Sequence, residues 1–382
     1  MNVEPTDPDP RRDEVAARVL LARLGEPGDV RLGERLRRQG AVQTVLQILR
    51  GDTAVAGLST YQARLPVDTD VVALVAADID RLQRVDAVLV LPGTSDWPTQ
   101  LDDLGDAAPL LLSVRGAAHL RMSALRAVSI VGARASTQYG DLVAGELAAG
   151  LAERGWTVVS GGAFGIDAAA HRGAIAAGGP SVAVLAGGVD VAYPRAHEAL
   201  FARLLDEGLL VAESPPGSAP HRSRFLVRNR VIAALTRGTV VVEAALRSGS
   251  LSTARHARDL GRVVMGVPGP VTSSMSAGVH RELREGALLV GSVEEIIEAV
   301  GGLGVDLAPR RSGRSRLRDD LDAVSIRVLD ALPPRAGADA AAISCTAGID
   351  LSTTMATLGL LELAGFVTRD RDGWRLAPQG RA

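Results

Sequence analysis

The segment Val128-Ser-Ile-Val131-Gly-Ala-Arg134 decides the fold, because a short β-branched run ends directly in a glycine turn. The pattern returns further along the chain in Thr157-Val-Val-Ser160-Gly-Gly162, in Ser181-Val-Ala-Val-Leu185 before Gly187, and in Thr239-Val-Val-Val242-Glu243 before Gly249. Apolar strands that alternate with Ala-rich helical segments are typical of a doubly wound sheet. Glycines at the carboxyl ends of such strands let a ligand approach the backbone. The sequence therefore predicts a Rossmann-like α/β fold with a mainly parallel sheet and a binding site at its carboxyl edge.

Six strands and four regions are expected. The strands are Ser129–Val131, Val158–Ser160, Val182–Leu185, Leu209–Ala212, Val240–Val242 and Val263–Val267. Residues 1–80 form a small helical module, SAM-like or helix-hairpin-like, and residues 81–300 form the Rossmann-like domain. Residues 301–318, with five arginines from Arg310 onward, are a flexible linker. Residues 319–382 predict a C-terminal winged helix, with helices at Ala341–Ala347 and Leu351–Leu363 and a hairpin turning at Asp372-Gly373.

Charge composition limits the possible functions. The 382 residues carry a formal net charge of −2, so any nucleic-acid binding must come from local basic patches. All basic side chains apart from histidine are arginine, a bias for which a GC-rich genome is the simpler explanation. Because the chain contains no lysine, P-loop hydrolysis is excluded.

Cysteine use and hydropathy indicate a cytoplasmic protein without a membrane partner. Cys345 is the single cysteine and excludes an internal disulfide. The segment Met1–Pro10 lacks the apolar core of a signal peptide, and no apolar run reaches the ~18 residues that span a bilayer. The six histidines show no metal-ligand spacing, so neither a metal nor a cofactor is expected.

The strongest nucleic-acid signature lies between Ser214 and Val242, where 29 residues hold five arginines and no acid. Arginines neutralise phosphates, and a phenylalanine among them can stack on an unpaired base. The candidate DNA-binding residues of this run are Arg222, Arg224, Phe225, Arg228, Asn229 and Arg230. We expect Arg228, like Arg134 of the first glycine turn, to lie on a loop rather than in the core. The alternative is a core phenylalanine beside an ordinary solvated face.

Further candidate DNA-binding residues come from the glycine turns. They are Gly132, Arg134, Ser160, Gly161, Gly162, Phe164, Ser248, Gly249 and Ser250. Backbone amides in such turns bind phosphate, and Arg134 can add a guanidinium. For Gly132 and Arg134 the alternative is a packing glycine and a surface arginine.

No catalytic residue is assigned. Asp167 and His171 are four residues apart and share a helical face, which favours capping and structural hydrogen bonds over catalysis. The alternative function is a Rossmann-fold nucleotide-phosphate hydrolase or nucleotide-binding enzyme that uses Glu243 as its acid/base. Hydrogen bonding of Glu243 to loop amides or to an arginine is the simpler expectation.

In their order, these motifs resemble the DprA/Smf family of DNA-processing proteins. The matching segments are Asp96-Trp-Pro98, Val131-Gly-Ala-Arg134, Ser160 to His171, Gly188 to Pro194, Glu213 to Gly217, Phe225 to Arg230, Val242-Glu243-Ala and Ser248 to Ala254. The chain departs from the family pattern at Gly162 and Phe164, where Leu and Arg are common, and at His280, where Asn is common.

The resemblance implies a non-enzymatic protein whose Rossmann-like domain binds single-stranded DNA. It further implies that the protein protects incoming strands during natural transformation, helps to load the RecA recombinase and forms a homodimer through the same domain.

Overall fold

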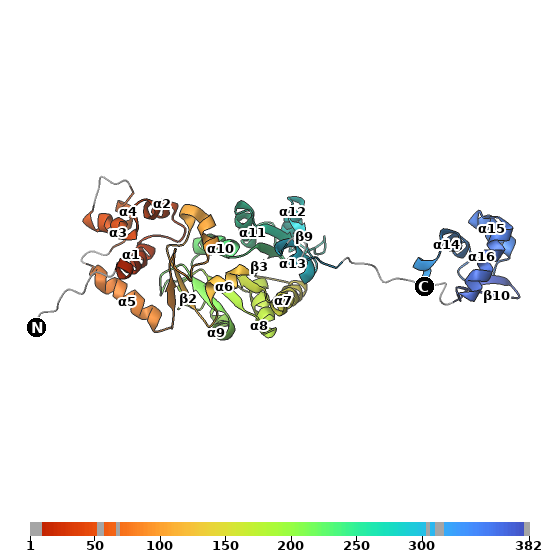
Figure 1. The fold of residues 1–382 in the computed structure, drawn as a ribbon, viewed down its shortest axis with the longest axis horizontal. Coiled ribbons are helices and arrows are strands. Elements are labelled where there is room, and N and C mark those ends of the chain that lie inside the picture. The colour runs from red at the N-terminus through yellow and green to blue at the C-terminus, as the bar shows by residue number, and fades with distance from the viewer. Residues whose placement is uncertain (1–9, 52–56, 66–68, 303–305, 310–316, 378–382) are drawn as a thin grey trace, which may run out of the picture. The chain divides into compact units, whose positions relative to one another are not determined.

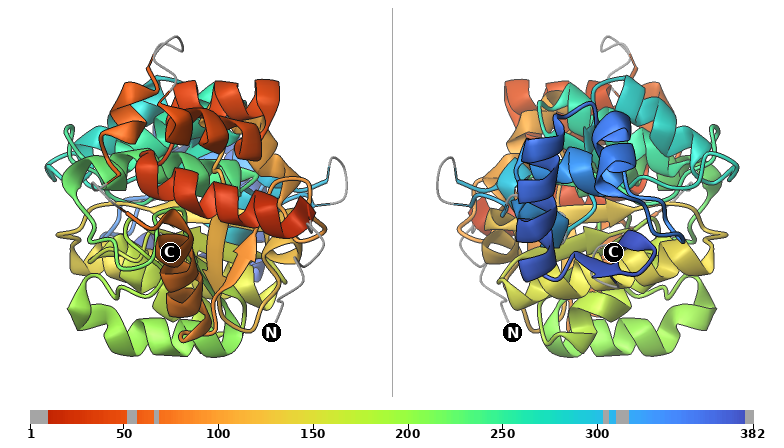
Figure 2. Two further views of the ribbon diagram at one scale, coloured as in Figure 1. Left: turned by 90° about the vertical axis from the view of Figure 1, so that its left-hand side faces the viewer. Right: turned by 90° about the vertical axis from the view of Figure 1, so that its right-hand side faces the viewer.

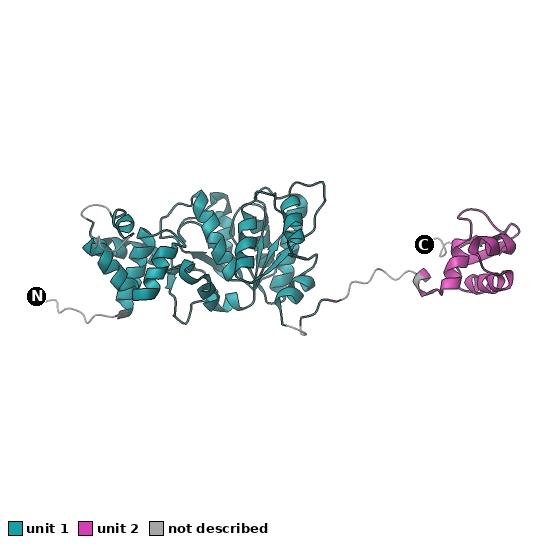
Figure 3. Cartoon of the chain, turned by 90° about the horizontal axis from the view of Figure 1, so that it is seen from above, with its two compact units in different colours: residues 1–308 teal, residues 309–382 magenta. Residues whose placement is uncertain are grey.

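The computed structural model describes residues 10–51, 57–65, 69–302, 306–309 and 317–377. The chain divides into two compact units, 1–308 and 309–382, which Figure 3 colours separately. Parts of the expected linker, residues 303–305 and 310–316, lie outside the described residues. No helix among the described residues is long and apolar enough to cross a membrane.

The first unit begins with the expected helices. They are α1 (Pro10–Leu24), α2 (Val30–Gln39), α3 (Ala41–Arg50), α4 (Ser59–Gln62) and α5 (Val71–Gln83). Leu21, Leu24 and Leu32 of these helices share a buried cluster with Leu91 and Leu111 beside the sheet. Figure 1 shows these helices, red to orange, at one end of the unit, and the left panel of Figure 2 looks onto that end. They are therefore packed onto the sheet region rather than separated from it.

A nine-stranded sheet forms the centre of the first unit, in the order β1-β2-β6-β5-β4-β3-β7-β8-β9. The strands are β1 (Val88–Val90), β2 (Leu112–Arg115), β3 (Ala127–Val131), β4 (Thr157–Ser160), β5 (Ser181–Leu185), β6 (Leu209–Ala212), β7 (Gly238–Val241), β8 (Val263–Gly266) and β9 (Leu288–Leu289). From β6 to β9 every neighbouring pair is parallel, whereas β2 is antiparallel to both β1 and β6. The Rossmann-like, mainly parallel fold is confirmed, and all six expected strands are present.

Helices cover both faces of this sheet (Figure 1). They are α6 (Leu120–Leu125), α7 (Gln138–Glu153), α8 (Ile166–Ala176), α9 (Glu198–Glu207), α10 (Arg222–Ala234), α11 (Ser250–Asp259), α12 (Ala277–Arg284) and α13 (Val293–Val300), with 3-10 turns η1 (Thr99–Ala107) and η2 (Arg195–His197). Val128 and Ile130 of β3 pack with α7 and α8, while Ala127 and Val131 pack with α10 and α11. This alternation along β3 is what burial on both faces of a parallel strand requires.

The second unit contains the expected helices and hairpin. Its elements are η3 (Leu317–Asp320), α14 (Ala323–Asp330), α15 (Ala340–Ala347), α16 (Leu351–Leu363), β10 (Val367–Asp370) and β11 (Gly373–Leu376). Gly348 ends α15 in the left-handed conformation and allows the sharp turn into α16. Leu358, Phe366 and Trp374 belong to the small core that joins the helices to the hairpin.

Candidate nucleic-acid interface

The candidate site lies where the sheet reverses its order of winding. Strands β4 and β7 lie on opposite sides of β3, so the segments that follow β3 and β7 leave a crevice at their carboxyl ends. A cavity of about 970 Å³ opens there, lined by residues that follow β3 and β7 and by α10 and α11. The turn after β3 packs tightly against α8 at Gly132, because a Cβ there would lie 2.5 Å from Cγ1 of Ile166.

The cavity is strongly basic although the whole chain is slightly acidic. The six arginines that line it are Arg134, Arg222, Arg228, Arg247, Arg255 and Arg281. Asp167 is the single acid among the described residues of the lining. Its carboxylate is buried and accepts hydrogen bonds from the Gly161 and Ala163 amides, and burial raises its pKa. The positive charge therefore faces the cavity, whereas the one carboxylate is occupied by the loop.

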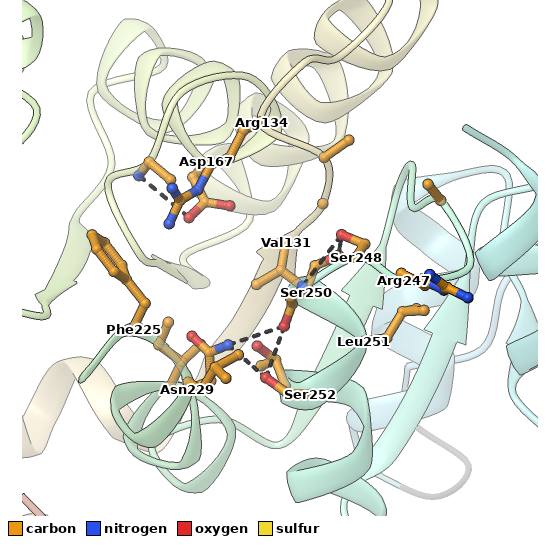
Figure 4. A pocket seen from close by; sticks show the side chains of 18 of the residues that line it. Val131, Arg134, Asp167, Phe225, Asn229, Arg247, Ser248, Ser250, Leu251 and Ser252 are labelled. Atoms are coloured by element: carbon orange, nitrogen blue, oxygen red, sulfur yellow. Dashed lines mark hydrogen bonds between the residues drawn. The ribbon is translucent and has the colours of Figure 1, made fainter. Parts of the chain in front are cut away.

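An aromatic pair forms part of the cavity wall. The guanidinium of Arg134 lies over the Phe225 ring at 4.5 Å from its centroid, and that of Arg228 lies at 6.0 Å. The ring of Tyr193 is 5.7 Å from the Phe225 ring and 48% of this tyrosine is exposed. Arg134 and Phe225 face the cavity from one side and Arg247 from the other (Figure 4). Charged groups and aromatic rings thus occur together, as in sites for unpaired nucleotides.

The amino end of α11 forms the other wall of the cavity. Ser248 and Ser250 share a hydrogen bond of 2.8 Å between their hydroxyls. The Asn229 amide donates to the Ser252 hydroxyl at 2.7 Å and to the Gly249 carbonyl at 3.2 Å. These bonds fix the start of α11 against α10, and a helix amino-terminus favours anions. Asn229 acts here by positioning the wall.

The structure corrects the expectation that Arg228 lies on a loop. Arg228 belongs to α10, is 7% exposed and donates to the Gly161 carbonyl at 2.8 Å and to the Val184 carbonyl. Burial lowers its pKa to about 10, so the guanidinium remains charged at neutral pH. Arg228 therefore ties the β4 and β5 ends to α10 and contributes charge beneath the cavity.

Arg224 and Arg230, which the sequence predicts to bind DNA, are paired with acids in the structure. The Arg230 guanidinium is buried and donates to both Glu213 oxygens, at 2.7 and 2.8 Å. Arg224 donates to Glu26 of the segment between α1 and α2 at 3.1 Å. Neither arginine lines the cavity. The segment from Ser214 to Val242 contains no acid, but Glu213 and Glu26 from other segments contact its arginines in the folded protein.

The loop after β4 lies beside the cavity and contributes to it only partly. The Ser160 hydroxyl is buried and donates to the Ile130 carbonyl at 2.7 Å. Gly161 packs against the Arg228 guanidinium, and Gly162 against the Phe201 ring. Phe164 is 47% exposed, and its ring lies edge-on to the His197 ring at 4.7 Å. Ala163 lines the cavity, whereas these four predicted residues do not.

Glu243 and His171 are held in structural roles. The Glu243 carboxylate is buried and accepts from the Thr137 amide at 2.9 Å and the Thr137 hydroxyl at 2.7 Å. This confirms the expected hydrogen bond to a loop amide, and Glu243 does not line the cavity. His171 Nδ1 lies 2.8 Å from the Ser181 hydroxyl, and burial lowers the pKa of His171 to about 3.

The sequence-based prediction missed Tyr193 and three of the cavity arginines, Arg247, Arg255 and Arg281 of α12. Tyr193 follows β5, while Arg247 and Arg255 flank and enter α11. Arg247 directly precedes the predicted Ser248, so its position was a usable signal. Nothing in the sequence links Tyr193 to Phe225, which is 32 residues away.

A family model described as DNA recombination-mediator protein A matches residues 88–301, more than half of the chain. The chain belongs to the DprA/Smf family. It is 43% identical over 373 residues to a putative DNA processing protein DprA of Mycobacterium tuberculosis, which covers 95% of this chain and 94% of that protein. It is 44% identical over 211 residues to the protein Smf of Escherichia coli, and this match covers 55% of this chain and 56% of that protein. The X-ray structure of DprA from Streptococcus pneumoniae superposes with a TM-score of 0.63 at 27% identity, over 79% of this chain and 100% of that chain.

Proposed function

We propose that this DprA/Smf-family protein binds and protects single-stranded DNA and helps to load the RecA recombinase during DNA uptake in natural transformation. The observation that carries the binding proposal is the cavity at the β3–β7 crevice, which Arg134, Arg222, Arg247 and Arg255 line together with the Tyr193–Phe225 pair. Arg228 is buried beneath this space, and Arg281 at its rim pairs with Glu282 and Glu285. The binding residues are the cavity arginines, the two rings and the turns at Gly132 and Ser248–Ser250.

The chemistry of the cavity favours a single strand with little sequence preference. Arginines bind the phosphates, and base stacking on an aromatic ring tolerates any base. A paired base inside a duplex does not offer its face to Phe225 or Tyr193. Affinity therefore falls steeply with added salt, because each arginine that binds a phosphate displaces a counterion.

The competing hydrolase function has no specific support in the geometry. Both carboxylate oxygens of Glu243 accept hydrogen bonds from Thr137. Glu243→Gln is therefore expected to destabilise the fold by about 1–3 kcal/mol, because an amide group would face the Thr137 donors. Incubation with nucleoside triphosphates and oligonucleotides is expected to leave them intact. Turnover that disappears in Glu243→Gln while the protein stays folded would favour the enzyme.

Binding is tested by titrating labelled single-stranded and matched double-stranded oligonucleotides across a salt series. We expect tight single-strand binding, weak duplex binding at moderate salt and a linear fall of log affinity with log salt. Equal affinity for the duplex, measured on residues 1–308 alone, would exclude the proposal for the cavity.

The role in recombination is tested by adding the protein to single strands already coated with single-strand-binding protein. RecA ATPase activity is the readout for the formation of RecA filaments. We expect the filaments to form faster when the protein is added, and an unchanged rate of filament formation would contradict the loading role. We further propose a homodimer through the Rossmann-like domain. Sedimentation of residues 1–308 at several concentrations tests it, and a monomer throughout would disprove it.

A further inference from the structure

A second basic cavity lies among the N-terminal helices, outside the interface described above. It has a volume of about 380 Å³ and is lined by Asp29, Val30, Arg31, Arg35, Gly57, Thr60, Tyr61 and Arg64. Three arginines from α2 and from the segment after α4 therefore converge on one space. We propose that this N-terminal cavity binds a backbone phosphate of the same single strand and so extends the DNA path. The inference rests on the proposed function.

The one acid among the described residues of the N-terminal cavity is already occupied. One oxygen of Asp29 accepts from the Arg31 and Leu32 amides at the start of α2. The other oxygen accepts from the Tyr61 hydroxyl at 2.7 Å. Burial, together with this hydrogen bond, raises the pKa of Tyr61, which remains a neutral donor. The lining thus holds three arginines and one carboxylate among the described residues. The carboxylate is engaged within the protein, and so is Arg64, which donates to the Leu24 carbonyl at 2.7 Å.

The N-terminal cavity is held rigidly against the helix that carries Phe225. The Gly28 amide donates to Glu213 at 3.2 Å, and a Cβ at Gly28 would lie 2.7 Å from Nε of Arg230 on α10. Asp29 is the next residue and caps the start of α2. The wall of this cavity is therefore fixed relative to α10 by buried contacts.

A short series of side chains connects the two cavities. Glu26 binds Arg224 of α10 at 3.1 Å and lies 3.9 Å from Arg64, which lines the N-terminal cavity. Arg222, two residues before Arg224, lines the first cavity. In Figure 1, α10 lies between the N-terminal helices and α11. The two cavities are therefore linked through α10 and the segment between α1 and α2, and we expect the strand in the first cavity to continue toward Arg64, Arg31 and Arg35.

Phosphodiester groups match the chemistry of the N-terminal cavity better than an apolar ligand. Arginine offers forked donors that suit phosphate oxygens, and Thr60 adds a hydroxyl. Among the described residues, no aromatic ring other than the engaged Tyr61 lines this cavity, so it would hold the backbone rather than a base.

The test compares two strand lengths on the full chain. The probes are oligothymidylates of about 6 nucleotides, near the lower end of the ~4–16 nucleotides that a single-strand site covers, and of about 30 nucleotides, well beyond its upper end. In the double variant Arg31→Ala, Arg35→Ala, affinity for the long probe is expected to fall about two- to fivefold per arginine, the range of exposed charge pairs. The slope of log affinity against log salt should decrease by about 0.7 for each phosphate that the variant no longer binds. Affinity for the short probe should not change.

Matched controls separate this inference from the proposed function. Arg38→Ala removes an exposed arginine of the same helix that pairs with Glu34 outside the cavity, and it should leave both probes unaffected. Arg134→Ala should weaken both probes alike. If the double variant binds the long probe like the wild type, the inference fails and the function stands. If the wild type binds neither probe, the proposed function itself fails.

A third arm distinguishes a strand phosphate from a small phosphate ligand. Inorganic phosphate and thymidine monophosphate are titrated against the wild type and the double variant by calorimetry. Only weak, millimolar-range binding is expected, because a single phosphate lacks the interactions made by the rest of the strand. Tight binding that requires Arg31 and Arg35, without any effect of strand length, would overturn the inference.

Discussion

Neighbouring arginines of this protein differ in whether they face the open cavity or the protein interior. Arg134 is exposed over Phe225 and forms no ion pair with any described residue. Arg134→Ala should therefore change the free energy of unfolding by less than about 0.5 kcal/mol. Its single-strand affinity should fall, and the salt slope should become shallower by about 0.7. Denaturation curves and strand titrations measure the two effects.

Arg228→Ala is the contrasting change at this scale. The buried guanidinium of Arg228 satisfies the Gly161 and Val184 carbonyls, and its removal orphans both. We expect a loss of roughly 1–3 kcal/mol of stability for each buried carbonyl left without a donor. An unaltered melting temperature would show that water or another side chain replaces the guanidinium as donor to the two carbonyls. Arg228 would then not be needed to hold the ends of β4 and β5 against α10.

His171 predicts a pH dependence of stability. Its pKa is about 3 in the folded state and about 6.5 when unfolded, so only the unfolded chain takes up a proton between these values. Its contribution is thus complete above pH 6.5 and is lost as the pH falls. Relative to His171→Gln, the wild type should lose about 1 kcal/mol between about pH 7 and 5.5. The stabilities are measured by urea denaturation at both pH values. If the wild type and His171→Gln lose the same stability between them, His171 titrates equally in the folded and unfolded states.

At the scale of single elements, α10 combines packing and binding on its different faces. Arg230 faces the interior and Arg228 is buried beneath the cavity, while Arg222, Phe225 and Asn229 also line it. This division explains why a uniform acid-free run does not form a uniform basic surface.

Phe225 tests the binding face of this helix. Phe225→Leu keeps apolar volume but removes the ring, so single-strand affinity should fall by about 1–3 kcal/mol if a base stacks there. Phe225→Tyr retains the ring and serves as the control. Equal affinities for the Leu and Tyr variants, at equal stability, would show that the ring only packs against Arg134.

At the scale of the whole molecule, the first unit contains the entire candidate interface. All residues that line the large cavity lie between 131 and 281. In the second unit, Arg375 pairs with Asp370 and Asp372, and Arg369 lies over the Trp374 ring. None of the arginines of the chain lies in α16, the helix that would enter a groove of DNA in a winged helix.

Removal of residues 309–382 should therefore leave a folded protein with most of its single-strand affinity. The second unit is expected to add at most a modest, salt-sensitive increment. Strand titrations of residues 1–308 against the full chain measure it, with circular dichroism as a check of folding. A folded but non-binding first unit would transfer the DNA site to the second unit.

The sequence by itself determined the sheet, its glycine turns and the family, because these depend on neighbours along the chain. A β-branched run followed by glycine predicts a buried strand and a tight turn wherever it occurs, which is why β3, β4, β5 and β7 were found. Strands β1, β2 and β9 were not predicted. β1 and β9 have only three and two residues, and β2 pairs antiparallel with β1 and β6, outside the alternation of parallel strands and helices.

Only the tertiary structure decided which predicted residues face the cavity. Arg224 pairs with Glu26 and Arg230 pairs with Glu213, so neither is an unpaired charge at the cavity. The Ser160 hydroxyl is buried and donates to the Ile130 carbonyl. The cavity wall also contains Tyr193, Arg247 and Arg255. Their separation along the sequence does not show that they lie close together. The physical reason is that ion pairing, burial and stacking depend on distance in space. A local pattern specifies a residue's own backbone but not the partner that reaches its side chain.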